Sequence, residues 1–214
     1  DISQKMCLFW HNHFAVTAVA DPRATYDYFA LIRQFALGNF RQFVKDMTIN
    51  PAMLLFLNGA TNTLFSPNEN YARELLELYT VGKGPQIGPG DYTNYTEEDV
   101  AAGAKILTGY LVDGIGSDTL TDVTAVYTDV LHDSSTKTLS AHFGNATISN
   151  NMGNEYADYI DVIFGQNAVA EHICRKLYRY FVNYDLTTDV ETNVIPIMSA
   201  TLISNNYEIL PVMS

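Results

Sequence analysis

Residues 68–80 hold the densest group of ionisable and amide side chains in the chain. Placed at 100° per residue on a helix, these side chains share one polar face, which is made of Glu69, Asn70, Arg73, Glu74 and Glu77. As a solvated ladder, Arg73 would pair with Glu69 and Glu77 at i,i+4 for about 0.2–0.5 kcal/mol each. In a partly buried cleft, Arg73 would instead hold Glu69 or Glu74 ionised and directed at a ligand or metal. Both interpretations fit the spacing.

A second polar group, His11, Asn12 and His13, interrupts the apolar segment 2–19. Because residues i and i+2 point about 200° apart on a helix, His11 and His13 cannot chelate one metal from the same regular helix. If this segment faces residues 68–80, two His and two Glu could bind a divalent metal or act as a general acid and base. Metal-assisted or acid–base hydrolysis of a polar substrate would follow. The alternative is a buried hydrogen-bond network that locks helix packing.

A third polar group lies at His132, Asp133 and Lys137. Asp133 and the serines after it separate two stretches of strand-like alternation, which predicts a hairpin tip with a turn role for His132 and Asp133. The candidate catalytic residues are therefore Glu74, Arg73, His13 and Glu69, and the candidate binding residues are His11, Asn12, Asn70, Glu77, His132, Asp133 and Lys137.

Apolar periodicity with Pro and Gly breaks predicts a mainly α fold, a helical bundle-like array with a small β-hairpin excursion around residues 110–140. Helices are expected near residues 2–19, 24–37, 40–47, 51–56, 68–80, 96–107, 155–164, 168–183 and 190–204. The Gly- and Pro-rich segment 82–90 matches no phosphate-binding motif and is expected to be a surface connector. We expect one mostly helical domain over residues 1–214, truncated at both ends, with a small β/loop insertion over residues 109–150.

The composition and charge of the chain limit the classes of partner that it is expected to bind. The chain is 47% hydrophobic and 17% charged, which is typical of a globular protein. Its net charge of -12 disfavours nucleic acid as a partner. The cationic group Arg175, Lys176 and Arg179 is expected to be a solvated helix face. No apolar run is long enough for a transmembrane segment, and Cys7 and Cys174 are expected to be unbonded thiols.

The 14 tyrosines favour a different class of function. Tyrosine and tryptophan are enriched in binding surfaces, so the chain could be a non-enzymatic scaffold that binds a partner protein or a glycan. That hypothesis predicts patches of exposed Tyr and Trp, and it treats the polar cluster as structural.

Several segments occur together in the order of a known family. They are KMCLFWHNHF (5–14), PAML (51–54), NENYARELLELYT (68–80), YTEEDV (95–100), LTG (107–109), HD (132–133), KT (137–138) and RKLYRYFV (175–182). In these segments the chain resembles the bacterial domain of unknown function 1800 family. The resemblance implies a mainly helical fold and a periplasmic or extracellular bacterial setting, and it implies no established activity. Tyr110 stands where the family usually carries Trp, and residues 141–150 diverge.

Overall fold

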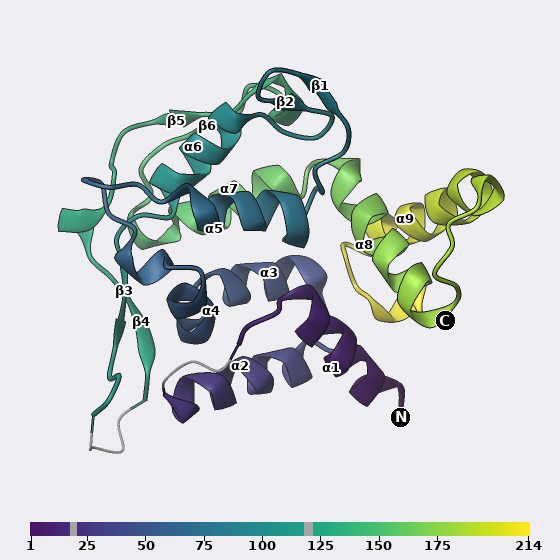
Figure 1. Ribbon diagram of the computed structural model, residues 1–214, viewed down its shortest axis with the longest axis horizontal. Helices are drawn as coiled ribbons and strands as arrows, with labels where there is room; N and C mark the ends of the chain where they lie inside the picture. Colours follow the sequence, from purple (N-terminus) through teal and green to yellow (C-terminus); the bar gives the residue numbers. More distant parts are fainter. Residues whose placement is uncertain (18–20, 118–121) are drawn as a thin grey trace.

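Helices dominate the computed structural model, which describes residues 1–17, 21–117 and 122–214. They are α1 (Ile2–His13), α2 (Pro22–Gln34), α3 (Phe40–Thr48), α4 (Pro51–Phe56), α5 (Glu69–Glu74), α6 (Glu97–Ile106), α7 (Glu155–Ile163), α8 (Asn167–Phe181) and α9 (Ile195–Ser204). The predicted mainly α class is confirmed. Contacts join α1 to α2, α2 to α3, α3 to α7, and α6 to both α5 and α7, whereas α8 packs on α9 at one side of the molecule (Figure 1).

Short polar residues begin most of these helices. The side chains of Asp21, Asn39, Asn50 and Asn68 each accept a backbone N–H from the first turn of the helix that follows, which satisfies a donor that has no partner within the helix. At Thr96 a capping box is present, because Thr96 accepts from the Asp99 N–H and the Asp99 side chain accepts from the Thr96 N–H.

The Thr96 cap allows a direct stability test. Thr96→Ala removes the hydroxyl that accepts from the Asp99 N–H at 3.2 Å, so we expect a loss of about 1 kcal/mol in the free energy of unfolding. Thr136→Ala, at an exposed loop position, is the matched control and is expected to change stability by less than about 0.5 kcal/mol. Urea denaturation of both variants measures the difference. Equal midpoints would show that the cap contributes nothing.

The helix over residues 68–80 changes its winding halfway. It begins at the Asn68 cap, runs as α5 to Glu74, and continues as a π-helical turn over Leu75–Tyr79. This wider turn shifts later residues away from the positions of a regular wheel, and Arg73 pairs with Glu97 instead of Glu77. Gly82 follows this turn, and its φ of 73° favours glycine.

Aromatic residues from α1 and α3 fill the centre of the core. The fully buried Trp10 ring stacks on Phe40 at 5.2 Å between centroids, and its Nε1–H donates to the Ala36 carbonyl at 3.0 Å. The first helix is shorter than the expected range 2–19, since it ends at His13, and the apolar segment leaves one side in solvent, where Leu8 is 55% exposed. Residues 18 and 19 of the predicted helix lie outside the described residues.

The strands pair differently from the prediction. β3 (Tyr110–Asp113) pairs with β4 (Thr124–Tyr127), and β5 (Lys137–Thr138) pairs with β6 (Thr147–Ile148). The predicted hairpin tip at residues 133–135 is therefore wrong. The turn between β5 and β6 lies at Gly144 and Asn145, which both have positive φ. β1 (Gln86–Gly88), within the expected connector, forms another short antiparallel pair with β2 (Asp91–Tyr92), which directly follows the connector.

Cys7 and Cys174 are both free thiols, which confirms the prediction. Over the described parts of the chain, none of the helices has the length and apolar character needed to span a bilayer.

Candidate functional site

The predicted site residues lie in three places. His13 lies at the contact between α1 and α8, the Arg73 group lies between α5 and α6, and the His132 group lies beside α7. Among the described residues, no hydrogen bond or ion pair links His13 to Glu69, Glu74 or Arg73. The expected cluster of two His and two Glu is therefore not assembled.

The Arg73 group is a set of partly exposed ion pairs. Arg73 Nη2 lies 2.7 Å from Glu97 Oε2 and 3.2 Å from Glu69 Oε2. The hydrogen bond from Arg73 lowers the pKa of Glu97. Glu77 accepts instead from the Tyr95 hydroxyl at 2.7 Å. This arrangement resembles the solvated ladder, with Glu97 in the place expected for Glu77.

Two candidates on the same helix have few partners. Glu74 makes no hydrogen bond or ion pair with the described residues, and burial followed by the charge of Glu77 raises its pKa. Asn70 is exposed, and its backbone N–H donates to the Asn68 cap. Neither residue lies in the cavity described below.

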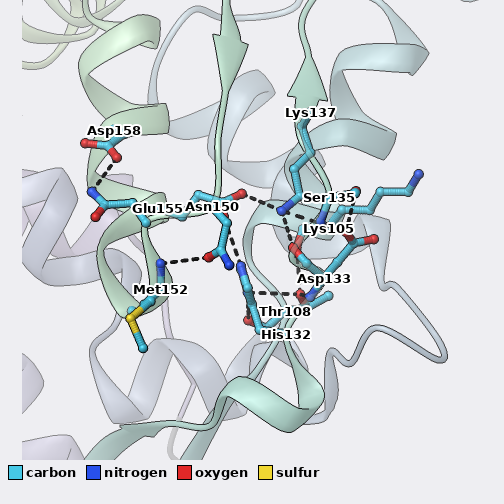
Figure 2. A network of polar contacts seen from close by, with 12 residues as sticks. Lys105, Thr108, His132, Asp133, Ser135, Lys137, Asn150, Met152, Glu155 and Asp158 are labelled. Atoms are coloured by element: carbon cyan, nitrogen blue, oxygen red, sulfur yellow. Dashed lines mark hydrogen bonds and ion pairs between the residues drawn. The ribbon is translucent and has the colours of Figure 1, made fainter.

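The His132 group is a closed internal network, in which His132 and Lys137 both approach Glu155 (Figure 2). The side chains of all three are at most 1% exposed. Glu155 accepts from Lys137 Nζ at 2.6 Å and lies 3.0 Å from His132 Nε2. His132 Nδ1 lies 2.9 Å from the Thr108 carbonyl, which can only accept, so Nδ1 carries a proton.

This burial contradicts the predicted turn role of His132. Burial, the largest single effect, opposes protonation of the ring, but the hydrogen bonds to Glu155 and the Thr108 carbonyl together with the charge of Glu155 outweigh it, and the pKa of His132 is raised. Asp133 does form a local turn, since its side chain accepts the Ser135 N–H at 2.9 Å. Lys137 also donates to the Asp133 carbonyl. The network links β5 and the segment that contains His132 to α7, and its role is therefore structural.

His11 has a structural contact of the same kind. Its Nδ1 lies 2.9 Å from the Tyr28 hydroxyl, and that hydroxyl donates to the Phe14 carbonyl at 3.0 Å. Because the single hydroxyl proton is used on Phe14, His11 Nδ1 is the donor to Tyr28. The contact joins α1 to α2, as the packing alternative predicted for the histidines.

His13 differs because it borders a cavity. The cavity has a volume of about 300 Å³ and lies where α1, α8 and the segment after α8 meet. Its lining combines aromatic rings with an amide, an imidazole, an amine and a guanidinium, from Phe9, Asn12, His13, Lys176, Arg179, Tyr180 and Tyr184. Of the predicted site residues, His13 and Asn12 line it.

The π-helical turn supplies backbone acceptors to two of the residues that line this cavity. His13 Nε2 lies 3.2 Å from the Tyr79 carbonyl, and Lys176 Nζ donates to the Leu78 carbonyl at 2.7 Å. Since a carbonyl only accepts, His13 carries its proton on Nε2 and leaves Nδ1 unprotonated. Lys176 Nζ, 3.1 Å from this Nδ1, is then the donor to it. His13 and a backbone carbonyl thus hold the Lys176 amine from two sides.

The basic groups here are difficult to protonate. Burial lowers the pKa of Lys176 to about 8. Burial, followed by the charges of Lys176 and His172, lowers the pKa of His13 well below its ordinary value. The neighbouring His172 has its pKa lowered to about 4, again mainly by burial. At neutral pH both imidazoles are therefore uncharged, and the amine lies near its titration point.

Sequence reasoning missed Lys176, which it assigned to a solvated cationic face with Arg175 and Arg179. Arg175 does pair with Glu191 at 2.9 Å and with Glu171 at 3.0 Å. Lys176 instead lies next to the buried stripe that contains Ile173 and Leu177. Its i,i+3 spacing from Ile173 was the available signal, although spacing alone does not reveal a cavity.

The site has no evident metal set. In residues 1–17, 21–117 and 122–214, no group of three or more His, Cys, Asp or Glu side chains is arranged to hold a metal ion. The groups at the cavity are donors and a titrating amine, which suit an anion and proton transfer.

Comparison with known proteins agrees with the resemblance seen in the sequence. A family model described as "Protein of unknown function (DUF1800)" matches residues 1–214, the whole chain. No curated protein and no solved structure matches the chain.

Proposed function

Because the chain belongs to the DUF1800 family, whose description states no reaction, we propose a function from the cavity between α1 and α8. The cavity binds a small organic anion, and Lys176 exchanges a proton with that ligand. The observation that carries the proposal is the placement of the Lys176 amine, which borders the cavity and is held by His13 Nδ1 and the Leu78 carbonyl.

Charge at the cavity favours an anion. Arg179 lies one helical turn after Lys176, so the two side chains share a face of α8. Within the described residues Arg179 has no hydrogen bond or ion pair, and it lines the cavity. A free guanidinium is a planar donor that suits a carboxylate or phosphate. A local cationic site in a chain of net charge -12 therefore supports recognition of a negatively charged group.

The remaining lining favours a ligand with an apolar body. Phe9 and Tyr180 pack edge to face at 5.4 Å between ring centroids, and Tyr184 is 82% exposed at the rim. The volume of about 300 Å³ is at the lower end of ligand pockets. A flat or aliphatic body of few atoms with one anionic group suits these walls.

Proton transfer is the reaction that this amine supports best. A base whose pKa lies close to the working pH is populated in both protonation states, which is the condition for efficient general acid–base catalysis. Lys176, with its pKa lowered to about 8 by burial, meets that condition, and neutral His13 positions it. The acid–base hypothesis thus moves from Glu69, Glu74 and Arg73 to Lys176, and we do not carry the metal-assisted alternative forward.

The scaffold hypothesis has less support. Trp10 is fully buried, and three of the 14 tyrosines are exposed, namely Tyr26, Tyr180 and Tyr184. Two of these three line the same cavity, where their rings suit stacking on a sugar face. A neutral sugar that binds there while aromatic anions do not would favour the glycan alternative. We keep the extracytoplasmic setting implied by the resemblance as part of the proposal.

Titration calorimetry with phenyllactate at pH 7 tests the proposal. We expect saturable binding, and we expect Lys176→Met and Arg179→Met each to weaken it by about tenfold or more, because a hydrogen bond to a charged group contributes about 1.5–3 kcal/mol. Lys5→Met, at an exposed position of α1, is the control and should bind as the unaltered chain does. Absence of binding, or equal affinity in all four proteins, would contradict the proposal.

A further inference from the structure

We propose that Lys176 is a carbonyl-reactive amine that forms a reversible imine with a 2-oxo acid in the α1–α8 cavity. This inference rests on the proposed function and goes further, since it names the ligand class and a covalent step. It stands on the geometry around the Lys176 nitrogen and on the position of Arg179.

The hydrogen bonds of Lys176 leave its lone pair free. A neutral amine has two N–H groups and one lone pair. The Leu78 carbonyl and His13 Nδ1 both accept from Nζ, at 2.7 Å and 3.1 Å, so they use both N–H groups. Because the nitrogen is tetrahedral, its lone pair points away from both acceptors. The amine thereby keeps its nucleophilic electron pair, which is the state that attacks a carbonyl.

The other lysines with side-chain partners lie against carboxylates. Lys45 pairs with Asp161 at 2.7 Å, Lys83 pairs with Glu77 at 3.3 Å, and Lys137 pairs with Glu155 at 2.6 Å. A carboxylate partner favours the charged form. The contacts of Lys176 are a carbonyl and a neutral imidazole, and its side chain is largely buried. This environment favours the uncharged amine, in agreement with its lowered pKa.

Arg179 selects a carbonyl compound that also carries a carboxylate. With the carboxylate paired to the Arg179 guanidinium one turn away on α8, the adjacent carbon of a 2-oxo acid lies toward Lys176. The rings of Phe9, Tyr180 and Tyr184 then face its side chain. A neutral aldehyde lacks the first contact, and a 2-hydroxy acid lacks the electrophilic carbon.

The chemical step balances without any oxidant or metal. The Nζ lone pair forms a bond to the carbonyl carbon while the C=O π pair moves to oxygen, and one proton passes from nitrogen to that oxygen to give a carbinolamine. The nitrogen lone pair then expels the hydroxyl group, which leaves as water after taking a proton from solvent. Loss of the second amine proton to solvent gives the imine, so amine and ketone become imine and water.

Reductive trapping tests the inference on the whole chain. The protein is incubated with phenylpyruvate and cyanoborohydride at pH 7.5, and modified lysines are located by peptide mass spectrometry, which also separates Lys176 from the chain's amino terminus. We expect Lys176 to be alkylated at least about tenfold faster than Lys5 or Lys105, both of which are exposed, because a larger fraction of it is neutral. Excess phenyllactate should slow labelling at Lys176 alone, and Lys176→Arg should lose the label at this position.

Each outcome separates the two proposals. Labelling of Lys176 that phenyllactate suppresses supports both. Phenyllactate binding without preferential labelling of Lys176 overturns the imine and leaves the anion site standing. Labelling that is equal at Lys176, Lys5 and Lys105 also overturns the imine. Failure of phenyllactate to bind or to protect overturns the anion site, and with it the placement of a 2-oxo acid by Arg179.

Discussion

Replacing Glu155 with alanine is expected to lower the free energy of unfolding by about 3–5 kcal/mol, because it leaves buried charge without compensation. Lys137 donates to Glu155 at 2.6 Å and has a side chain that is 1% exposed. His132 is likewise buried and lies 3.0 Å from the same carboxylate. Removal of that carboxylate strands the ammonium group in the interior, where water cannot solvate it. Guanidinium denaturation followed by circular dichroism measures the loss.

A double variant distinguishes this cause from lost packing. In Lys137→Met with Glu155→Met neither the buried ammonium group nor the buried carboxylate remains, so we expect a smaller loss than in Glu155→Ala alone. Glu69→Ala, which removes a half-exposed partner of Arg73, is the surface control and should cost no more than about 1 kcal/mol. If Glu155→Ala were no more destabilising than Glu69→Ala, the buried network would have no structural role.

In contrast to Glu155→Ala, Lys176→Met is expected to raise the free energy of unfolding at pH 7, by on the order of 1–3 kcal/mol. The folded-state pKa of Lys176, lowered to about 8, lies below the unfolded value of about 10.4. Between these values the unfolded chain binds a proton that the folded chain does not, so stability rises with pH. Below about pH 8 both states are protonated and the cost of burying the ammonium is fully present. Methionine removes that cost.

The stability advantage of Lys176→Met should therefore shrink as pH rises from about 8 and be gone near 10.5. The groups around the amine are His13 from α1, and His172, Arg175 and Arg179 from α8. Both histidines are uncharged throughout this window and both arginines remain charged. None of these groups therefore makes the stability difference between the two proteins depend on pH. Urea denaturation of Lys176→Met and the unaltered chain at each pH cancels the contribution of the buried tyrosines. A difference that is constant with pH would contradict the account.

Local features of the fold could be predicted from the sequence, because they depend on neighbours along the chain. The Asn68 cap, the Thr96 capping box and the positions of most helices follow from short-range hydrogen bonds and apolar spacing. The paired strands are consecutive but short, and the two-residue strands β5 and β6 carry little pattern to specify a partner. The hairpin assigned to residues 133–135 was wrong for that reason.

The site was harder to predict because burial changes the chemistry of a side chain. His132 and Lys137 were chosen as candidate binding residues, but both are buried against Glu155, which comes from α7. Lys176 meets His13 across 163 positions of sequence, and its acceptors depend on a π-helical turn that a regular helical wheel does not contain. A charge pattern assigns such a lysine to the surface, whereas the fold places it at a cavity.

Titration of the Lys176 side chain by NMR, with its ¹³Cε and ¹⁵Nζ resonances assigned by comparison with Lys176→Arg, tests the central claim most directly. The account predicts a midpoint near pH 8, because burial against His13 and the Leu78 carbonyl lowers the pKa of the amine. A midpoint near the ordinary lysine value of about 10.4 would show that Lys176 is a solvated ammonium group, and it would contradict both the proton-transfer proposal and the imine.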